Sequence, residues 1–378
     1  MAQQHLDPTD PQSRRAGPTP TLGSAGGAAP TGDALAGYLR AQATEFLRAL
    51  RLHRETGSGP HGSGPQGSGG PADPVDAARA LRRAVRRISG SLHTFRPLLD
   101  SDWSESMRPE LAWLSGTLAM EHAYAARLER LLLALHRLSG AVFPAQPAGA
   151  TVGAAQAGNP GPPAPPAAPD RGNLTVGAAK AGALLERQLT LARTRAHSTA
   201  LQALGSSRFH AVADNIAVLA SEVPLVPTAT TTNLHPQAAA AQERLTAAVT
   251  ALPLVTAGHP YNAEALIHGL SPDPAPHPQD APWHQVRLLL RLHRYAREVL
   301  QGTDAPVDVR LLTAGQALDR HRDASEAAGA AAQAARTPRI APATAYALGV
   351  LHADQRHEVE AARFAFQQSW QKQTVGTP

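Results

Sequence analysis

The chain has 378 residues, of which 43% are hydrophobic and 4% aromatic, with a formal net charge of +5 and no cysteine. The apolar content is enough for a sizeable core, while the lack of cysteine excludes disulfide bonds, thiolate metal sites and a cysteine nucleophile. No apolar run reaches the roughly 18 residues that a membrane span requires, and the N-terminus lacks the apolar segment of a signal peptide, so we expect a cytoplasmic protein without membrane contact.

The composition predicts an all-α protein, because Ala, Leu and Arg are abundant and lose little side-chain freedom in a helix. Residues 1–32 are rich in Pro, Gly and Thr, and we expect a disordered tail there. A Pro/Ala/Gly-rich insertion is expected over about 142–172. Apolar periodicity predicts helices over 32–55, 76–92, 106–139 (one or two helices), 176–204, 207–221, 237–252, 283–301, 308–335 and 341–371.

The helix expected over 76–92 separates its apolar side chains from its basic ones. At 100° per residue the basic side, opposite the leucines, carries Arg79, Arg82, Arg83, Arg86 and Arg87. Like charges at i,i+4 spacing destabilise a helix by roughly 0.2–0.5 kcal/mol per pair, and no glutamate on this face compensates them. We therefore expect an external anion to neutralise this stripe, although a simple solvated face is the alternative for any one charged helix.

The segment "WHQVRLLLRLHRYAREVL" repeats this design over 283–300. A basic stripe of about 80° contains His284, Arg287, Arg291 and Arg294. His284 taken alone is better explained as a histidine without a role near a helix N-terminus. Arginine presents a planar fork that suits phosphate oxygens, so two such stripes can converge on one polyanion.

Both segments resemble the CHAD family, the conserved histidine α-helical domain, whose motif reads approximately His-x-x-Arg-x-x-x-Arg/Lys-Arg-x-Arg. The first match is "RALRRAVRRISGSLHTFRPLL" and the second is "HQVRLLLRLHRYAREVL". A further helix, "ALDRHRDA" at 317–324, is similar to another family segment, with His321 and Asp323 retained and Asp319 in place of a glycine. The resemblance aligns the motif's characteristic positions with Arg82, Arg86, Arg87, His284, Arg287, Arg291, Arg294 and Tyr295.

The first motif departs from the family pattern. Arg79 stands where the family's name-giving histidine belongs, and Ser89 replaces the last arginine. The offset of about 200 residues between the two motifs is typical of an internal duplication. Whether the altered first half still binds a ligand is left open by the sequence.

The resemblance implies one CHAD-like domain over 33–373, with a first half at about 33–140 and a second at about 173–373. It further implies two pseudo-symmetric four-helix halves around a central basic pore or groove. The implied function is binding of inorganic polyphosphate without catalysis, cofactor or metal, with an association with polyphosphate granules. The residues expected to bind polyphosphate are Arg79, Arg82, Arg86, Arg87, His284, Arg287, Arg291, Arg294, Tyr295 and His321.

Two other functions remain open. A polyphosphate-processing hydrolase would need clustered carboxylates for a metal or a positioned base and nucleophile, and we expect Asp323 and Glu298 to orient arginines instead. A nucleic-acid-binding protein would need Asn or Gln for base readout or aromatic rings for stacking, and both are scarce on the basic faces. No protein partner can be predicted from the sequence.

Overall fold

The structure, a computed structural model, describes residues 30–57, 74–140, 169–259, 270, 277–302 and 306–371. These residues form ten α-helices and three short 3-10 helices without any strand, which confirms the all-α prediction. The predicted tail lies outside the described residues except at its end, and so does most of the predicted insertion. The α-helices are α1 (Gly32–Gly57), α2 (Pro74–Thr94), α3 (Ser101–Ser139), α4 (Pro169–Leu204), α5 (Ser207–Ser221), α6 (His235–Thr250), α7 (Leu254–Ala257), α9 (Ala281–Gln301), α10 (Val309–Ala335) and α11 (Pro342–Gln371).

Two long helices begin earlier than the sequence predicts, and one short helix was not predicted. Helix α3 begins at Ser101, because the carboxylate of Asp100 accepts a hydrogen bond from the Trp103 N–H at 2.8 Å and caps the first turn, and it continues as a single helix through Pro109. Helix α4 begins at Pro169, within the segment expected to be an insertion. The short helix α7 was not predicted.

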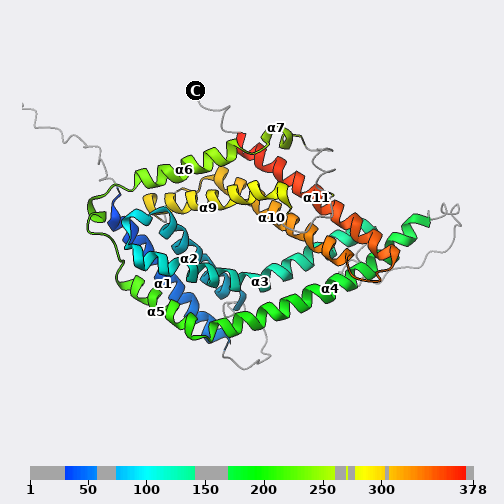
Figure 1. The fold of residues 1–378 in the computed structure, drawn as a ribbon, viewed down its shortest axis with the longest axis horizontal. Coiled ribbons are helices and arrows are strands. Elements are labelled where there is room, and N and C mark those ends of the chain that lie inside the picture. The colour runs from blue at the N-terminus through cyan, green and yellow to red at the C-terminus, as the bar shows by residue number, and fades with distance from the viewer. Residues whose placement is uncertain are drawn as a thin grey trace, which may run out of the picture.

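The buried hydrophobic side chains of the described residues form three cores that share the long helices. Figure 1 shows how these helices are arranged. The first core joins α1, α2, α5 and the N-terminal part of α3, with Phe46 and Ile88 at its centre. The second core joins the C-terminal half of α3 with α4, α10 and α11. The third core joins α6, α9, α10 and α11 around Trp283 and Phe366. The first two cores take residues from both sides of the predicted insertion, whereas the third takes them only from its C-terminal side. The division into two pseudo-symmetric halves stays a prediction.

Helices α2 and α9 approach each other closely at one glycine. A Cβ atom on Gly90 would lie 2.5 Å from Cδ2 of Tyr295, which is closer than side chains pack, so the absence of a side chain on Gly90 allows this approach. The contact sets the basic stripe of α2 opposite the basic stripe of α9. Among the described residues, no helix combines the length and the hydrophobicity needed to cross a bilayer.

Candidate functional site

Basic side chains from three helices gather where α2, α9 and α10 meet. We call this set the arginine cluster: Arg82 and Arg86 on α2, Arg287 and Arg291 on α9, and Arg322 on α10. Each guanidinium in the cluster acts electrostatically on several of the others. The structure thus brings the two predicted stripes together and adds Arg322, which sequence reasoning missed although it lies inside the segment compared with the family at 317–324.

Internal partners neutralise only part of this charge. The Nε of Arg287 donates to Oδ1 of Asp319 at 2.5 Å, and Arg322 pairs with Asp323 beside it on α10. By contrast, Arg82 and Arg291 make no hydrogen bond or ion pair with any described residue, and the Nε of Arg82 is buried without a partner. Two guanidinium groups of the cluster therefore have no counterion among the described residues.

The cluster holds its positive charges together at an energetic cost. Burial, followed by the charges of Arg86, Arg322 and Arg291, lowers the pKa of Arg82 to about 10. Burial is also the largest cause of the lowered pKa of Arg86, Arg287 and Arg291. Perturbed groups concentrated at one place are typical of a functional site.

A cleft of about 830 Å³ adjoins the cluster between α2, α3 and α9. Arg86 and Arg291 line it beside the apolar Leu111 and Leu288, and the Nε of Arg86 donates to the Ser115 hydroxyl at 3.4 Å. His93, Glu105 and Arg108 also line the cleft; Arg108 pairs with Glu105 at 3.0 Å, and burial lowers the pKa of His93. The positive charge in the cleft that has no carboxylate partner therefore lies at Arg86 and Arg291.

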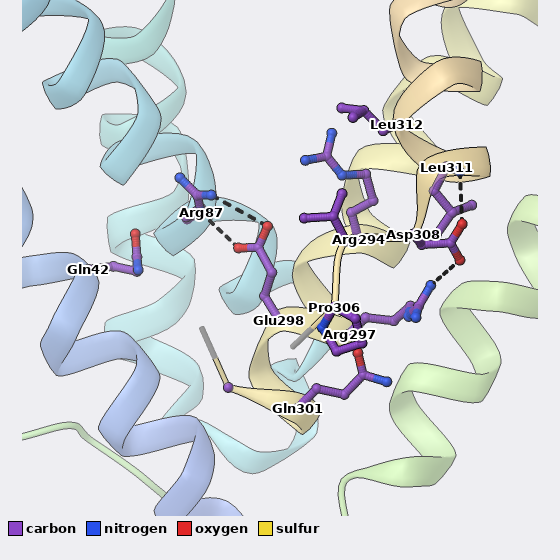
Figure 2. A pocket seen from close by; sticks show the side chains of 12 residues that line it. Gln42, Arg87, Arg294, Arg297, Glu298, Gln301, Pro306, Asp308, Leu311 and Leu312 are labelled. Carbon is purple, nitrogen blue, oxygen red and sulfur yellow. Dashed lines mark hydrogen bonds and ion pairs between the residues drawn. The ribbon is translucent and has the colours of Figure 1, made fainter. Parts of the chain in front are cut away.

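A smaller cavity of about 350 Å³ opens between α1, α2, α9 and the start of α10 (Figure 2). Arg87 and Arg294 line this cavity, and the Nε of Arg87 donates to the Glu298 carboxylate at 2.8 Å. The same carboxylate accepts a hydrogen bond from the Tyr38 hydroxyl at 2.8 Å. Glu298 therefore orients an arginine, as predicted.

The expectation that all the arginines of α2 lack an internal counterion is wrong. Arg87 pairs with Glu298, and Arg79 pairs with Asp76 at 3.0 Å one turn earlier on its own helix. The sequence did not indicate the pairing of Arg87 with Glu298, because the two residues are 211 positions apart. The unneutralised part of the α2 stripe lies at Arg82 and Arg86.

Three of the predicted site residues differ in accessibility. The Tyr295 ring is 8% exposed and lies 5.9 Å from the Arg87 guanidinium, and burial raises the pKa of its hydroxyl. His284 is half-buried, whereas His321 is 1% exposed, with ring centres 5.5 Å apart. Burial lowers the pKa of His321 to about 4, so His321 is neutral at pH 7 and supports the ring of His284 from behind.

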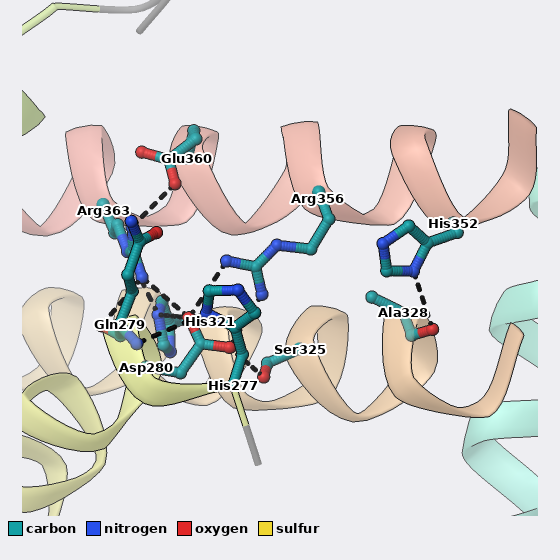
Figure 3. A network of polar contacts seen from close by, with 10 residues as sticks. All are labelled: His277, Gln279, Asp280, His321, Ser325, Ala328, His352, Arg356, Glu360 and Arg363. Carbon is teal, nitrogen blue, oxygen red and sulfur yellow. Dashed lines mark hydrogen bonds and ion pairs between the residues drawn. The ribbon is translucent and has the colours of Figure 1, made fainter. Parts of the chain in front are cut away.

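Behind His321 lies a buried ionic network that sequence reasoning did not find (Figure 3). Its centre is the fully buried carboxylate of Asp280, which lies 2.7 Å from a guanidinium nitrogen of Arg356 and 2.7 Å from one of Arg363. Arg363 also pairs with Glu360 at 2.7 Å, and the Nε2 of His321 lies 3.6 Å from Asp280. This network fastens the start of α9, where His284 lies, to α10 and α11.

The described residues contain no group of three or more His, Cys, Asp or Glu side chains placed to hold a metal ion. The carboxylates nearest the cluster, Asp319 and Asp323, are each engaged by an arginine. The arrangement is suited to holding an anion by charge-assisted hydrogen bonds.

Two comparisons with known proteins found a match. A family model described as the CHAD domain matches residues 68–332, a range that includes both basic stripes and Arg322. A solved structure described as PptA from Streptomyces chartreusis is 68% identical, with a TM-score of 0.71, covering 91% of this chain and 100% of that chain. The search of curated proteins found no match.

Proposed function

The chain belongs to the CHAD family, and we propose that it binds inorganic polyphosphate without chemically transforming it. The observation that carries this proposal is the arginine cluster, in which three helices place five guanidinium groups together and two of them have no partner among the described residues. We further propose that the protein acts in the cytoplasm in association with polyphosphate granules.

The chemistry of the cluster suits a repeating phosphate chain. A guanidinium donates paired hydrogen bonds to phosphate oxygens, and a linear polyphosphate presents one such anionic group after another. A single small anion would engage one or two of the five arginines, whereas a chain can engage all of them and continue into the cleft toward His93 and Arg108. Binding also brings negative charge to Arg82 and relieves its repulsion from its neighbours.

The alternatives find less support in the side chains around the cluster. Tyr295 is the one aromatic residue that lines the cleft, and its ring is 8% exposed, which leaves little surface for stacking a base. Asp319 and Asp323 are held by arginines and are not placed to share a metal, so a hydrolytic centre is not supported at this point.

Binding of fluorescent long-chain polyphosphate to paired variants tests the proposal. We expect Arg82→Ala/Arg86→Ala and Arg287→Ala/Arg291→Ala each to weaken binding at least about tenfold, because each removes two charge-assisted contacts. The matched control is Arg187→Ala/Arg195→Ala on α4, which removes the same charge from exposed positions and should bind like the wild type. Loss in the α9 pair alone would locate binding on the second motif, and loss in neither pair would contradict the proposal.

Competition experiments separate the alternative functions. Wild-type protein should retain polyphosphate against duplex DNA or heparin at equal charge concentration. A plot of log K for polyphosphate against the logarithm of the salt concentration should have a slope of about −0.7 for each phosphate contacted. Displacement by duplex DNA would favour the nucleic-acid function. Release of orthophosphate from polyphosphate in the presence of a divalent metal would favour the hydrolase.

A further inference from the structure

One carboxylate, that of Asp319, lies within the arginine cluster. Its Oδ1 accepts a hydrogen bond from the Nε of Arg287 at 2.5 Å. The same carboxylate acts electrostatically on Arg86, Arg291 and Arg322, so it faces arginines from α2, α9 and α10. Asp319 thus has the surroundings that a ligand phosphate would have.

The contact that holds Asp319 can be exchanged. The Arg287 side chain is 16% exposed and fixed, whereas the Asp319 side chain is 55% exposed and makes no other hydrogen bond with the described residues. The Glu298 carboxylate differs, because it is more buried and is held by Tyr38 as well as by Arg87. A short side chain on the exposed edge of α10 can release Arg287 by a change of rotamer while the helix stays in place.

We propose that Asp319 is an internal counter-anion that occupies Arg287 in the free protein and is displaced by a phosphate group of the ligand. A carboxylate and a phosphate are both oxyanions that accept hydrogen bonds from a guanidinium, so they compete for the same donors. The inference rests on the proposed function and adds to it a free-energy cost, the displacement of Asp319, that the binding of every ligand must offset.

This cost sets a minimum number of contacts for detectable binding. Displacing Asp319 weakens every ligand by the same factor, so the ratio of affinities between ligands is unchanged while each affinity falls. Orthophosphate, with one or two contacts, then binds too weakly to stay on the protein, whereas a chain that engages Arg82, Arg86 and Arg291 at the same time remains bound. The ligand that occupies the cluster is therefore a polyvalent phosphate chain.

Calorimetric titration of Asp319→Asn with tripolyphosphate and with long-chain polyphosphate tests the inference. We expect both affinities to rise about fivefold, the size expected for loss of one partly exposed ion pair. Because the ligand contacts Arg287 in both proteins, the slope of log K against log salt should change by less than the value for one phosphate contact, about 0.7. The matched control is Glu110→Gln, which frees Arg208 from a pair of 2.7 Å on another surface with the same change of charge, and it should bind within about twofold of the wild type.

The variant Asp319→Glu separates charge from shape. It keeps the carboxylate and should bind within about twofold of the wild type, since the counter-anion is retained. If Asp319→Asn binds no more tightly than the wild type, or if Glu110→Gln or Asp319→Glu gains as much, the counter-anion role is wrong while polyphosphate binding stands. If the wild type itself binds neither phosphate chain, the proposed function fails and the inference with it. A thermal melt of each variant confirms that it is folded before titration.

Discussion

We predict that Arg82 lowers the free energy of unfolding of the free protein and raises its affinity for polyphosphate. Its guanidinium is partly buried, its Nε has no partner, and the nearest charges are those of Arg86, Arg322 and Arg291. Replacing it in Arg82→Met keeps most of the apolar stem and removes the charge. The variant should unfold less readily than the wild type and bind polyphosphate less tightly.

The magnitude follows from the pKa of Arg82, which burial and then the neighbouring charges lower on folding by between two and three, to about 10. Each whole step of pKa corresponds to about 1.4 kcal/mol, so the unscreened penalty is about 3 kcal/mol. Because the side chain is partly exposed, solvent screening reduces this to about 1–2 kcal/mol. The Arg82 guanidinium holds its proton more tightly in the unfolded chain than in the folded protein. The charged side chain therefore lowers the free energy of unfolding by the full amount at every pH below about 10, including neutral pH.

Thermal unfolding and urea titration at pH 7 measure this effect. We expect the unfolding free energy of Arg82→Met to rise by about 1–2 kcal/mol, which raises the Tm by about 2–5 °C, while the affinity for polyphosphate falls about tenfold. The matched control is Arg83→Met, an exposed position on the same helix, whose stability should stay within about 0.5 kcal/mol. Equal or lower stability of Arg82→Met than of Arg83→Met would refute the reasoning.

Three further predictions concern the supports of the site. Asp280→Asn should lower the unfolding free energy in urea by about 3–5 kcal/mol, because it leaves two buried guanidinium groups without their carboxylate. Burial lowers the pKa of His284 in the free protein, and a bound phosphate would raise it, so binding takes up a proton and affinity should increase as the pH falls from about 8 to about 6. Gly90→Ala should lower stability by about 1–3 kcal/mol by forcing the Tyr295 ring away, whereas Gly116→Ala, which meets no atom within 4 Å, should raise it by about 0.5–1 kcal/mol.

Each of these predictions has its own check. Asp354→Asn, which breaks an exposed pair with Arg137 at 2.9 Å, should cost less than about 1 kcal/mol, and an equal loss in Asp280→Asn would count against the buried network. His284→Gln should flatten the pH dependence of binding, and an unchanged slope would assign the proton to another group. A Gly90→Ala protein as stable as the wild type would show that α2 and α9 can separate without cost.

Much of the helical layout could be predicted from the sequence, because apolar periodicity is a local signal. The stripes of α2 and α9 follow directly from spacings of three and four residues. The start of α3 was readable too, since Asp100 is a favoured N-cap residue, and Pro169 is a favoured first residue for α4. The residues around Asp100 and Pro169 have a composition typical of loops, and the prediction therefore placed the starts of both helices too late.

The partners of the charged residues could not be predicted in the same way. Whether Arg87 is free or paired depends on Glu298, which packing alone brings beside it. The Asp280 network likewise joins residues from three helices, and charges on the buried side of α11 are the one hint of it in the sequence. Such contacts depend on tertiary structure, which periodicity does not encode.

The way the cores share their helices has a consequence for folding. The second core closes α3 and α4 against α10 and α11, and the pair between Arg87 and Glu298 spans 211 residues of chain. At a synthesis rate of about 5–20 residues per second, α9 leaves the ribosome about 10–40 s after α2. The arginines of the two helices meet only when these long-range contacts form, a slow class of folding event. Substitutions in the second core, which contains none of the cluster arginines, should therefore lower the yield of protein in which the arginine cluster is assembled.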